Sequence, residues 1–173
     1  MVCFFRSLFS AVPRRGSTTV LAFVLLCGFS FGSVCAVVTD AFDVSLISKA
    51  AVTGMTFPGL LCVMLLPLVC SALAAYIHKI HFLMPIAFLK SFAFGYLASA
   101  VLVFYGSSGW LMQLLFLFSD CFSFPVLCKF WIAQYNSSGR GLLSGFAAAF
   151  ILIAAVVFLD CQYISPYLVM LLS

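Results

Sequence analysis

Charged residues, and acidic residues above all, are scarce in this chain. Glutamate is absent, and charged residues make up only 7% of the 173 residues. The four carboxylate side chains are all aspartates and are scattered: Asp40, Asp43, Asp120 and Asp160. Neighbours in the sequence therefore do not supply a paired-carboxylate catalytic site. Serine protease, zincin, P-loop and dinucleotide-binding motifs are also missing. We predict that the chain is not an enzyme and carries no cofactor.

The sequence also lacks a metal-binding pattern. Eight cysteines are present, but none forms a C-x-x-C pair, and most lie in apolar runs, where cysteine behaves as a small hydrophobic residue. His78 and His81 could share a helix face, but Lys79 between them and the absence of a further ligand nearby favour a solvated loop. We predict no metal site. A disulfide between Cys35 and Cys161 is left open, because the sequence does not give the distance between them.

Long apolar runs dominate the chain. Hydrophobic residues account for 66% of it, and the mean hydropathy is +1.30. This composition leaves no room for a separate soluble domain, so residues 1–173 are predicted to form a single integral membrane domain. The net charge of +4 is better explained by basic residues in cytoplasmic loops than by binding to nucleic acid. The lipid bilayer is the expected surrounding, in a multi-pass protein of the cell membrane.

Five runs reach the length of about 20 residues that a membrane-spanning helix needs. The fold class is therefore an all-α membrane protein, a bundle of about five transmembrane helices with short loops. The predicted spans are residues 18–38, 56–77, 82–105, 110–132 and 141–159. We expect residues 1–17 to lie at the membrane interface, and so too the apolar tail after Asp160, which Pro166 interrupts.

Two features qualify these spans. Pro67 lies in the middle of the second span and predicts a kink. The first span, with its basic flank, also resembles a secretory signal, and Gly32-Ser33-Val34-Cys35 resembles a lipoprotein cleavage site. The length of the apolar run and the poor fit of Val34 favour an uncleaved anchor.

The basic residues predict the orientation. With five spans, nearly all loop or span-end cations fall on one side: Arg6, Arg14, Arg15, Lys79, Lys129 and Arg140. Only Lys49 falls on the other side, beside Asp40 and Asp43. Because cytoplasmic loops are enriched in Lys and Arg, we predict that the N-terminus is inside and the C-terminus outside.

Lys90 and Asp120 are charged residues within apolar runs. A charge at bilayer depth is costly and marks a functional or packing contact by default. If the third and fourth spans form an antiparallel hairpin, the two residues lie at roughly matched depths of about 12 and 15 Å. They could then form an ion pair. Alternatively, Lys90 could extend toward the interface, and Asp120 could be protonated or bonded to Ser119, Ser123 or a carbonyl freed by Pro125.

Two G-x-x-x-G patterns occur in apolar spans, one formed by Gly28 and Gly32 and the other by Gly141 and Gly145. Small residues four positions apart let helices approach closely. We expect the first and fifth spans to pack on one another through these glycines. Dimerisation of the chain is the alternative.

A resemblance to a known family rests on residues 89–125. Leu89-Lys90-Ser91-Phe92-Ala93-Phe94-Gly95-Tyr96 resembles the Lys-Gly-Phe-x-x-Gly-aromatic signature of the stage II sporulation protein M family. Gly106 and Gly109 lie where that family has a Gly-x-x-Gly turn, and Pro125 where it has a second proline. Ser91 stands in place of a glycine, and Phe118-Ser119-Asp120 in place of Pro-Gln-Asn or Pro-His-Gly. The residues that carry over are Lys90, Phe92, Gly95, Gly106, Gly109 and Pro125.

The resemblance implies a non-enzymatic membrane scaffold of bacterial origin. The sporulation member holds cell-wall hydrolases at the membrane, so other membrane proteins or membrane-anchored cell-wall hydrolases are the partners that the resemblance implies. The alternative is a small-solute-binding subunit of a vitamin-type transporter, because intramembrane charge and proline-broken spans are typical of solute sites.

Overall fold

The computed structural model describes residues 15–38, 57–76, 82–106, 110, 114–115, 117–136 and 142–172. Several sequence-based expectations lie outside these residues. They concern the interfacial segment over residues 1–14, the loop over residues 39–53, the basic residues His78, Lys79 and His81, and the glycines Gly109 and Gly141.

The described chain is almost entirely helical. Its elements are α2 (Arg15–Val38), α4 (Phe57–Tyr76), α5 (Leu83–Tyr105), α7 (Phe118–Asn136), α8 (Leu142–Leu159), the π-helical turn η3 (Asp160–Ile164) and α9 (Ser165–Leu172). Four apolar helical stretches in it are long enough to cross a membrane: Thr19–Val38, Phe57–Tyr76, Leu83–Val103 and Leu143–Tyr167. Four such stretches are typical of a multi-pass membrane protein. The helix α7 lies beside them but is more polar, with Asp120 and Lys129.

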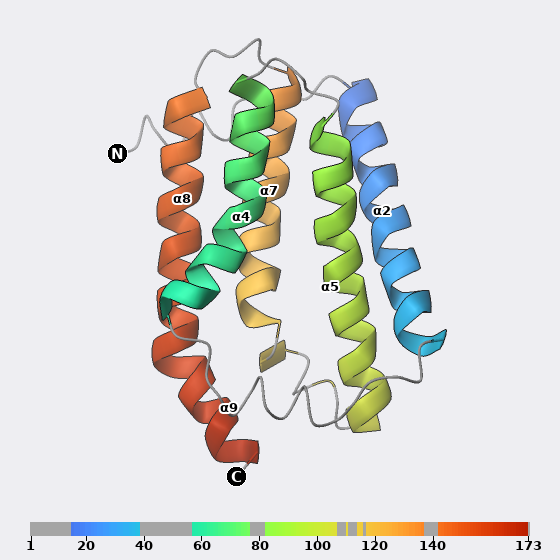
Figure 1. The fold of residues 1–173 in the computed structure, drawn as a ribbon, viewed down its shortest axis with the longest axis vertical. Coiled ribbons are helices and arrows are strands. Elements are labelled where there is room, and N and C mark those ends of the chain that lie inside the picture. Colours follow the sequence, from blue (N-terminus) through green and yellow to red (C-terminus); the bar gives the residue numbers. More distant parts are fainter. Residues whose placement is uncertain are drawn as a thin grey trace.

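The long helices stand side by side as an elongated bundle (Figure 1). Along the chain, α2, α4, α5, α7 and α8 run in alternating directions, so each is antiparallel to the next. Figure 1 also shows that α4 changes direction part-way along its length. Pro67 lies inside this helix and is the expected cause of the bend, because proline cannot donate the helical hydrogen bond.

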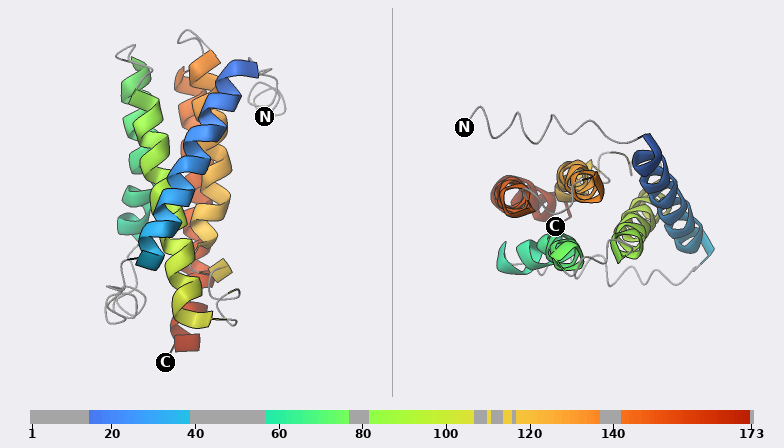
Figure 2. Two further views of the ribbon diagram at one scale, coloured as in Figure 1. Left: turned by 90° about the vertical axis from the view of Figure 1, so that its right-hand side faces the viewer. Right: turned by 90° about the horizontal axis from the view of Figure 1, so that it is seen from above.

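The helices form two groups. One is the pair α2 and α5, and the other is the set α4, α7 and α8 (Figure 2). By far the most extensive contact in the described bundle is between α2 and α5, whereas α8 packs against both α4 and α7. The expectation that the third and fourth spans pack on one another as a hairpin is wrong. Instead, α5 packs mainly on α2, and α7 packs mainly on α8.

Glycines bring the backbones of α2 and α5 into contact. A methyl group added at Gly28 would lie 2.7 Å from the Phe88 carbonyl oxygen, and one at Gly32 would lie 2.8 Å from the Tyr96 nitrogen. From the other side, a methyl group at Gly95 would lie 2.9 Å from the Phe29 Cα. The expectation that the first G-x-x-x-G pattern packs on the fifth span is therefore wrong, because Gly28 and Gly32 pack on α5.

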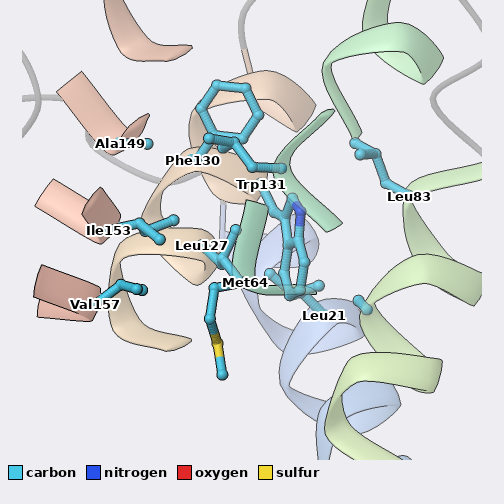
Figure 3. Packing of buried hydrophobic residues seen from close by; sticks show 11 residues of the cluster. Leu21, Met64, Leu83, Leu127, Phe130, Trp131, Ala149, Ile153 and Val157 are labelled. Atoms are coloured by element: carbon cyan, nitrogen blue, oxygen red, sulfur yellow. The ribbon is translucent and has the colours of Figure 1, made fainter. Parts of the chain in front are cut away.

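The apolar core lies mainly within the second group. Its most deeply buried large side chains there are Leu68, Leu127, Trp131, Ile153 and Val157. Figure 3 shows the last four of these together with Met64 and Phe130. Leu21 from α2 and Leu83 from α5 join the same cluster. Bulky side chains therefore connect the glycine-packed pair to the rest of the bundle.

Two helix boundaries differ from the predicted spans. The fourth span was expected over residues 110–132, but α7 begins at Phe118 and continues to Asn136. Ser119 and Asp120 explain this start, because Ser and Asp favour helix beginnings over helix interiors.

The tail after Asp160 was expected to leave the last helix. Instead the chain continues as η3 and then α9, and the apolar stretch Leu143–Tyr167 runs through this junction. The Ser165 N–H donates to the Asp160 carbonyl, five residues earlier. This wider π-helical turn leads the helix past Pro166, which has no N–H to donate.

Candidate functional site

The Lys90 ammonium and the Asp120 carboxylate form an ion pair between α5 and α7. Their side chains are 10% and 8% exposed, so the pair is buried within the bundle. The contact that the sequence suggested between these two residues is present. A buried charge is stable only when it is paired. The charge of Lys90 therefore explains how Asp120 can be buried, and the charge of Asp120 explains the same for Lys90. A second contact is made by Lys90 Nζ with the Met64 sulfur of α4, at 3.8 Å.

Asp120 is held at the start of a helix and not at mid-span. It lies in the first turn of α7, since α7 begins at Phe118. The free N–H groups at a helix N-terminus carry a partial positive charge of about half a unit, which stabilises a nearby carboxylate. Asp120 is therefore stabilised by both the ammonium of α5 and the beginning of its own helix.

A second carboxylate lies at the same helix start. The Ser119 hydroxyl donates a hydrogen bond to Asp160 Oδ2, and the Ser119 backbone N–H also bonds to Asp160. Asp160 is 9% exposed and belongs to the π-helical turn η3. It thus caps the N-terminus of α7 from another helix, as a capping side chain within the same helix would do.

Serine and methionine side chains extend this buried site. Ser123, one turn after Ser119 on α7, is fully buried, and its hydroxyl lies 3.8 Å from the Met64 sulfur. Met64 thus contacts both Lys90 and Ser123. We call the six residues that share these contacts the polar cluster: Met64, Lys90, Ser119, Asp120, Ser123 and Asp160.

The other predicted site residues lie elsewhere. Phe92 stacks between Phe88 and Tyr96 along α5, with ring centroids 6.5 and 6.3 Å away. Gly95 belongs to the α2–α5 contact. Gly106 follows the end of α5 with a φ of 58°, and its N–H bonds to the Leu102 carbonyl. Pro125 lies within α7 and is exposed. None of these four joins the polar cluster.

The second G-x-x-x-G pattern makes a looser contact than the first. Gly145 faces α7, where an added methyl group would lie 3.7 Å from the Phe130 ring, an ordinary contact distance. Gly141 lies outside the described residues.

Sequence reasoning gave no site role to Met64 and Asp160, and no helix-packing role to Ser91 and Ser33. Asp160 directly follows a continuous apolar run, a position that is typical of the end of a span. The adjacent apolar run is the only sequence signal for its burial. Ser91 donates to the Leu25 carbonyl at 2.5 Å, and Ser33 to the Gly95 carbonyl at 3.4 Å. Ser91 therefore ties α5 to α2 at the position where the resembled signature has a glycine.

The chemistry open to the polar cluster follows from its groups. It offers an ammonium, two carboxylates and two hydroxyls, which can hold or exchange protons and orient a small polar group. Within the described ranges, no three His, Cys, Asp or Glu side chains gather closely enough to hold a metal ion. Cys35 and Cys161, for which a disulfide was left open, are not bonded to one another.

Comparison with protein-family models, with curated proteins and with solved structures finds no match for this chain. The functional argument therefore rests on the residues of the chain and their arrangement.

Proposed function

We propose that this chain is a non-enzymatic scaffold of the cell membrane that crosses the bilayer five times, with its N-terminus inside and its C-terminus outside. In this proposal α7 is the fifth crossing, beside the four apolar helices. The alternating directions of the helices support five crossings (Figure 1). The basic residues of the loops support the orientation.

The observation that carries the scaffold proposal is the direction of the polar side chains. The buried polar residues of the described helices bond mainly to one another or to backbone carbonyls, as Lys90 does with Asp120 and Ser91 with Leu25. Outward positions are taken by large apolar side chains, such as Phe31 on α2 and Ile151 on α8, both 64% exposed. A bundle built in this way meets other membrane proteins through apolar helix faces, where van der Waals packing drives association.

The resemblance to the stage II sporulation protein M family supports the same function. It supplies the class of partner that we propose, namely other membrane proteins or membrane-anchored cell-wall hydrolases. Lys90 and Gly95, two residues of the resembled signature, contribute to the ion pair and to the α2–α5 contact.

The polar cluster favours a second candidate, a small-solute-binding subunit of a vitamin-type transporter. Two carboxylates, an ammonium and two hydroxyls at one level of a membrane bundle are groups that a polar solute could contact. The scaffold remains the better supported function, because Lys90, Asp120, Ser119 and Asp160 already bond to one another.

Photocrosslinking in the native membrane tests the scaffold. A photoreactive amino acid is placed at Phe31 or Ile151 on the outer faces, and at the fully buried Leu127 as a matched control. We expect defined adducts with a membrane protein or an anchored hydrolase from one outer face and none from Leu127. Absence of adducts from every outer position, together with a melting temperature raised by a vitamin-like solute, would favour the transporter subunit.

A further inference from the structure

The polar cluster contains one more negative group than positive groups. Its charged members are Lys90, Asp120 and Asp160, which carry one positive and two negative formal charges when all are ionised. The residues are at most about one-tenth exposed. A net charge in such a place, inside a bundle that crosses a bilayer, is strongly unfavourable unless it is neutralised.

No other described cation lies in position to neutralise the cluster. The remaining basic residues of the described ranges are Arg15, at the start of α2, and Lys129. Lys129 is exposed and lies nine positions after Asp120 on α7, about 13 Å farther along the helix. The helices α8 and α9, which adjoin Asp160 in the chain, contain no charged residue. The start of α7 contributes only about half a positive charge.

We propose that Asp160 is a proton-binding site, occupied at neutral pH, which keeps the polar cluster electrically neutral. The proton comes from water: a hydronium ion gives its proton to the Asp160 carboxylate and leaves as water. The protonated carboxyl group can still accept the Ser119 hydroxyl hydrogen on Oδ2.

The neighbours of each carboxylate assign the proton to Asp160 and not to Asp120. Asp120 contacts the Lys90 ammonium directly, so its charge is already paired. Among the described residues, Asp160 contacts Ser119 and no cation. Its burial, and then the Asp120 carboxylate, favour the protonated form, whereas the hydrogen bonds from the Ser119 hydroxyl and N–H favour the ionised form. The other ionisable groups near the pair are the thiols of Cys121 and Cys161, which are neutral at this pH, and Tyr163 on η3 is exposed.

Infrared spectroscopy of the purified full chain in lipid nanodiscs tests the site directly. A protonated carboxyl group has a C=O stretching band that an ionised carboxylate lacks. We expect this band in the native protein at neutral pH, its loss in Asp160→Asn, and its disappearance from the native protein as the pH is raised. Ser119→Ala should shift the frequency of the band, because it removes the hydrogen bond to the carboxyl group, whereas Ser123→Ala, the matched control on α7, should not.

The stability of the protein supplies an independent measurement. If the folded protein holds a proton that an exposed aspartate releases near pH 4, the free energy of unfolding must fall as the pH rises. Asp160→Asn replaces a neutral acid by a neutral amide that does not titrate, so the variant should lose this fall: it should melt like the native protein below about pH 4 and at a higher temperature than the native protein at neutral pH. A native protein without the band at neutral pH, or a band unchanged in Asp160→Asn, would overturn the proposal. Should that variant not fold, the effect of Ser119→Ala on the band decides.

Discussion

The Ser119 hydroxyl binds the Asp160 carboxylate across 41 positions of the chain and thereby joins the first turn of α7 to the end of α8. The next residue, Asp120, faces the opposite group of helices and pairs with Lys90. Two successive residues at one helix start therefore bind two different parts of the bundle. The stability of this junction and of the α2–α5 contact can be measured separately.

The ion pair should show strong coupling in a double-mutant cycle. Lys90→Met leaves Asp120 buried without its cation, and Asp120→Asn leaves Lys90 without its anion. Removing one partner of a buried pair costs about 3–5 kcal/mol, because the other charge is left unpaired. Removing both partners leaves no unpaired charge. The double variant should therefore be more stable than the sum of the single losses predicts. Unfolding in detergent or lipid measures this, and strict additivity would show that the pair contributes no coupling.

The glycines of α2 should not tolerate a methyl group. Gly28→Ala and Gly32→Ala each place the new carbon within 2.8 Å of the α5 backbone, so the helices must separate. We expect a loss of about 1–3 kcal/mol for each, as for other overpacked sites. Gly145→Ala is the matched control, because its methyl group would meet only the Phe130 ring at 3.7 Å. Equal melting temperatures for the three variants would argue against close α2–α5 packing.

The hydroxyl of Ser91 should contribute modestly to the same contact. Ser91→Ala removes the hydrogen bond to the Leu25 carbonyl, and hydrogen bonds between membrane helices contribute on average about 0.6 kcal/mol. Ser30→Ala is the control, since Ser30 lies on α2 but is exposed. Thermal unfolding of both variants measures the difference. A Ser91 variant as stable as the control would mean that the Leu25 carbonyl needs no partner from α5.

The orientation can be tested by labelling introduced cysteines. In a variant without the native thiols, Ser45→Cys should react with a membrane-impermeant reagent added outside intact cells, and Ser137→Cys only after the membrane is opened. The basic residues of the loops are the reason for this expectation. The reverse pattern would invert the proposed topology, and labelling of both positions from outside would contradict an odd number of crossings between them.

Sequence reasoning succeeded where a residue was chemically out of place. Lys90 and Asp120 interrupt apolar runs, so the cost of burying a charge was enough to suggest that they pair. Asp160 was missed because it follows an apolar run, where a charged residue usually marks the end of a span. Its burial depends on the continuation of the helix through η3, and nothing local in the sequence indicates a π-helical turn.

Partners between helices were harder to predict than the helices themselves. The glycines of α2 correctly indicated close packing, but all the spans have similar apolar faces, so their pattern does not say which helix approaches. Gly95, which completes the contact from α5, lies 63 positions after Gly32. The start of α7 was missed for a related reason: the apolar run before Phe118 has the composition of a span, and only Ser119 and Asp120 favour a helix start there.

The arrangement of the two helix groups has a consequence for biosynthesis. The helix α2 leaves the ribosome long before its partner α5, and α4, made between them, packs mainly against α8, which is made later still. For α2 and α4, the next helix in the chain is thus not the principal neighbour in the bundle. Until its partner is synthesised, the packing face of each early helix is covered only by lipid. In α2 this face includes the backbone at Gly28 and Gly32, which no side chain covers. Insertion and assembly are for this reason separate events, and a nascent chain arrested after α4 would contain neither of the main helix contacts of the finished protein.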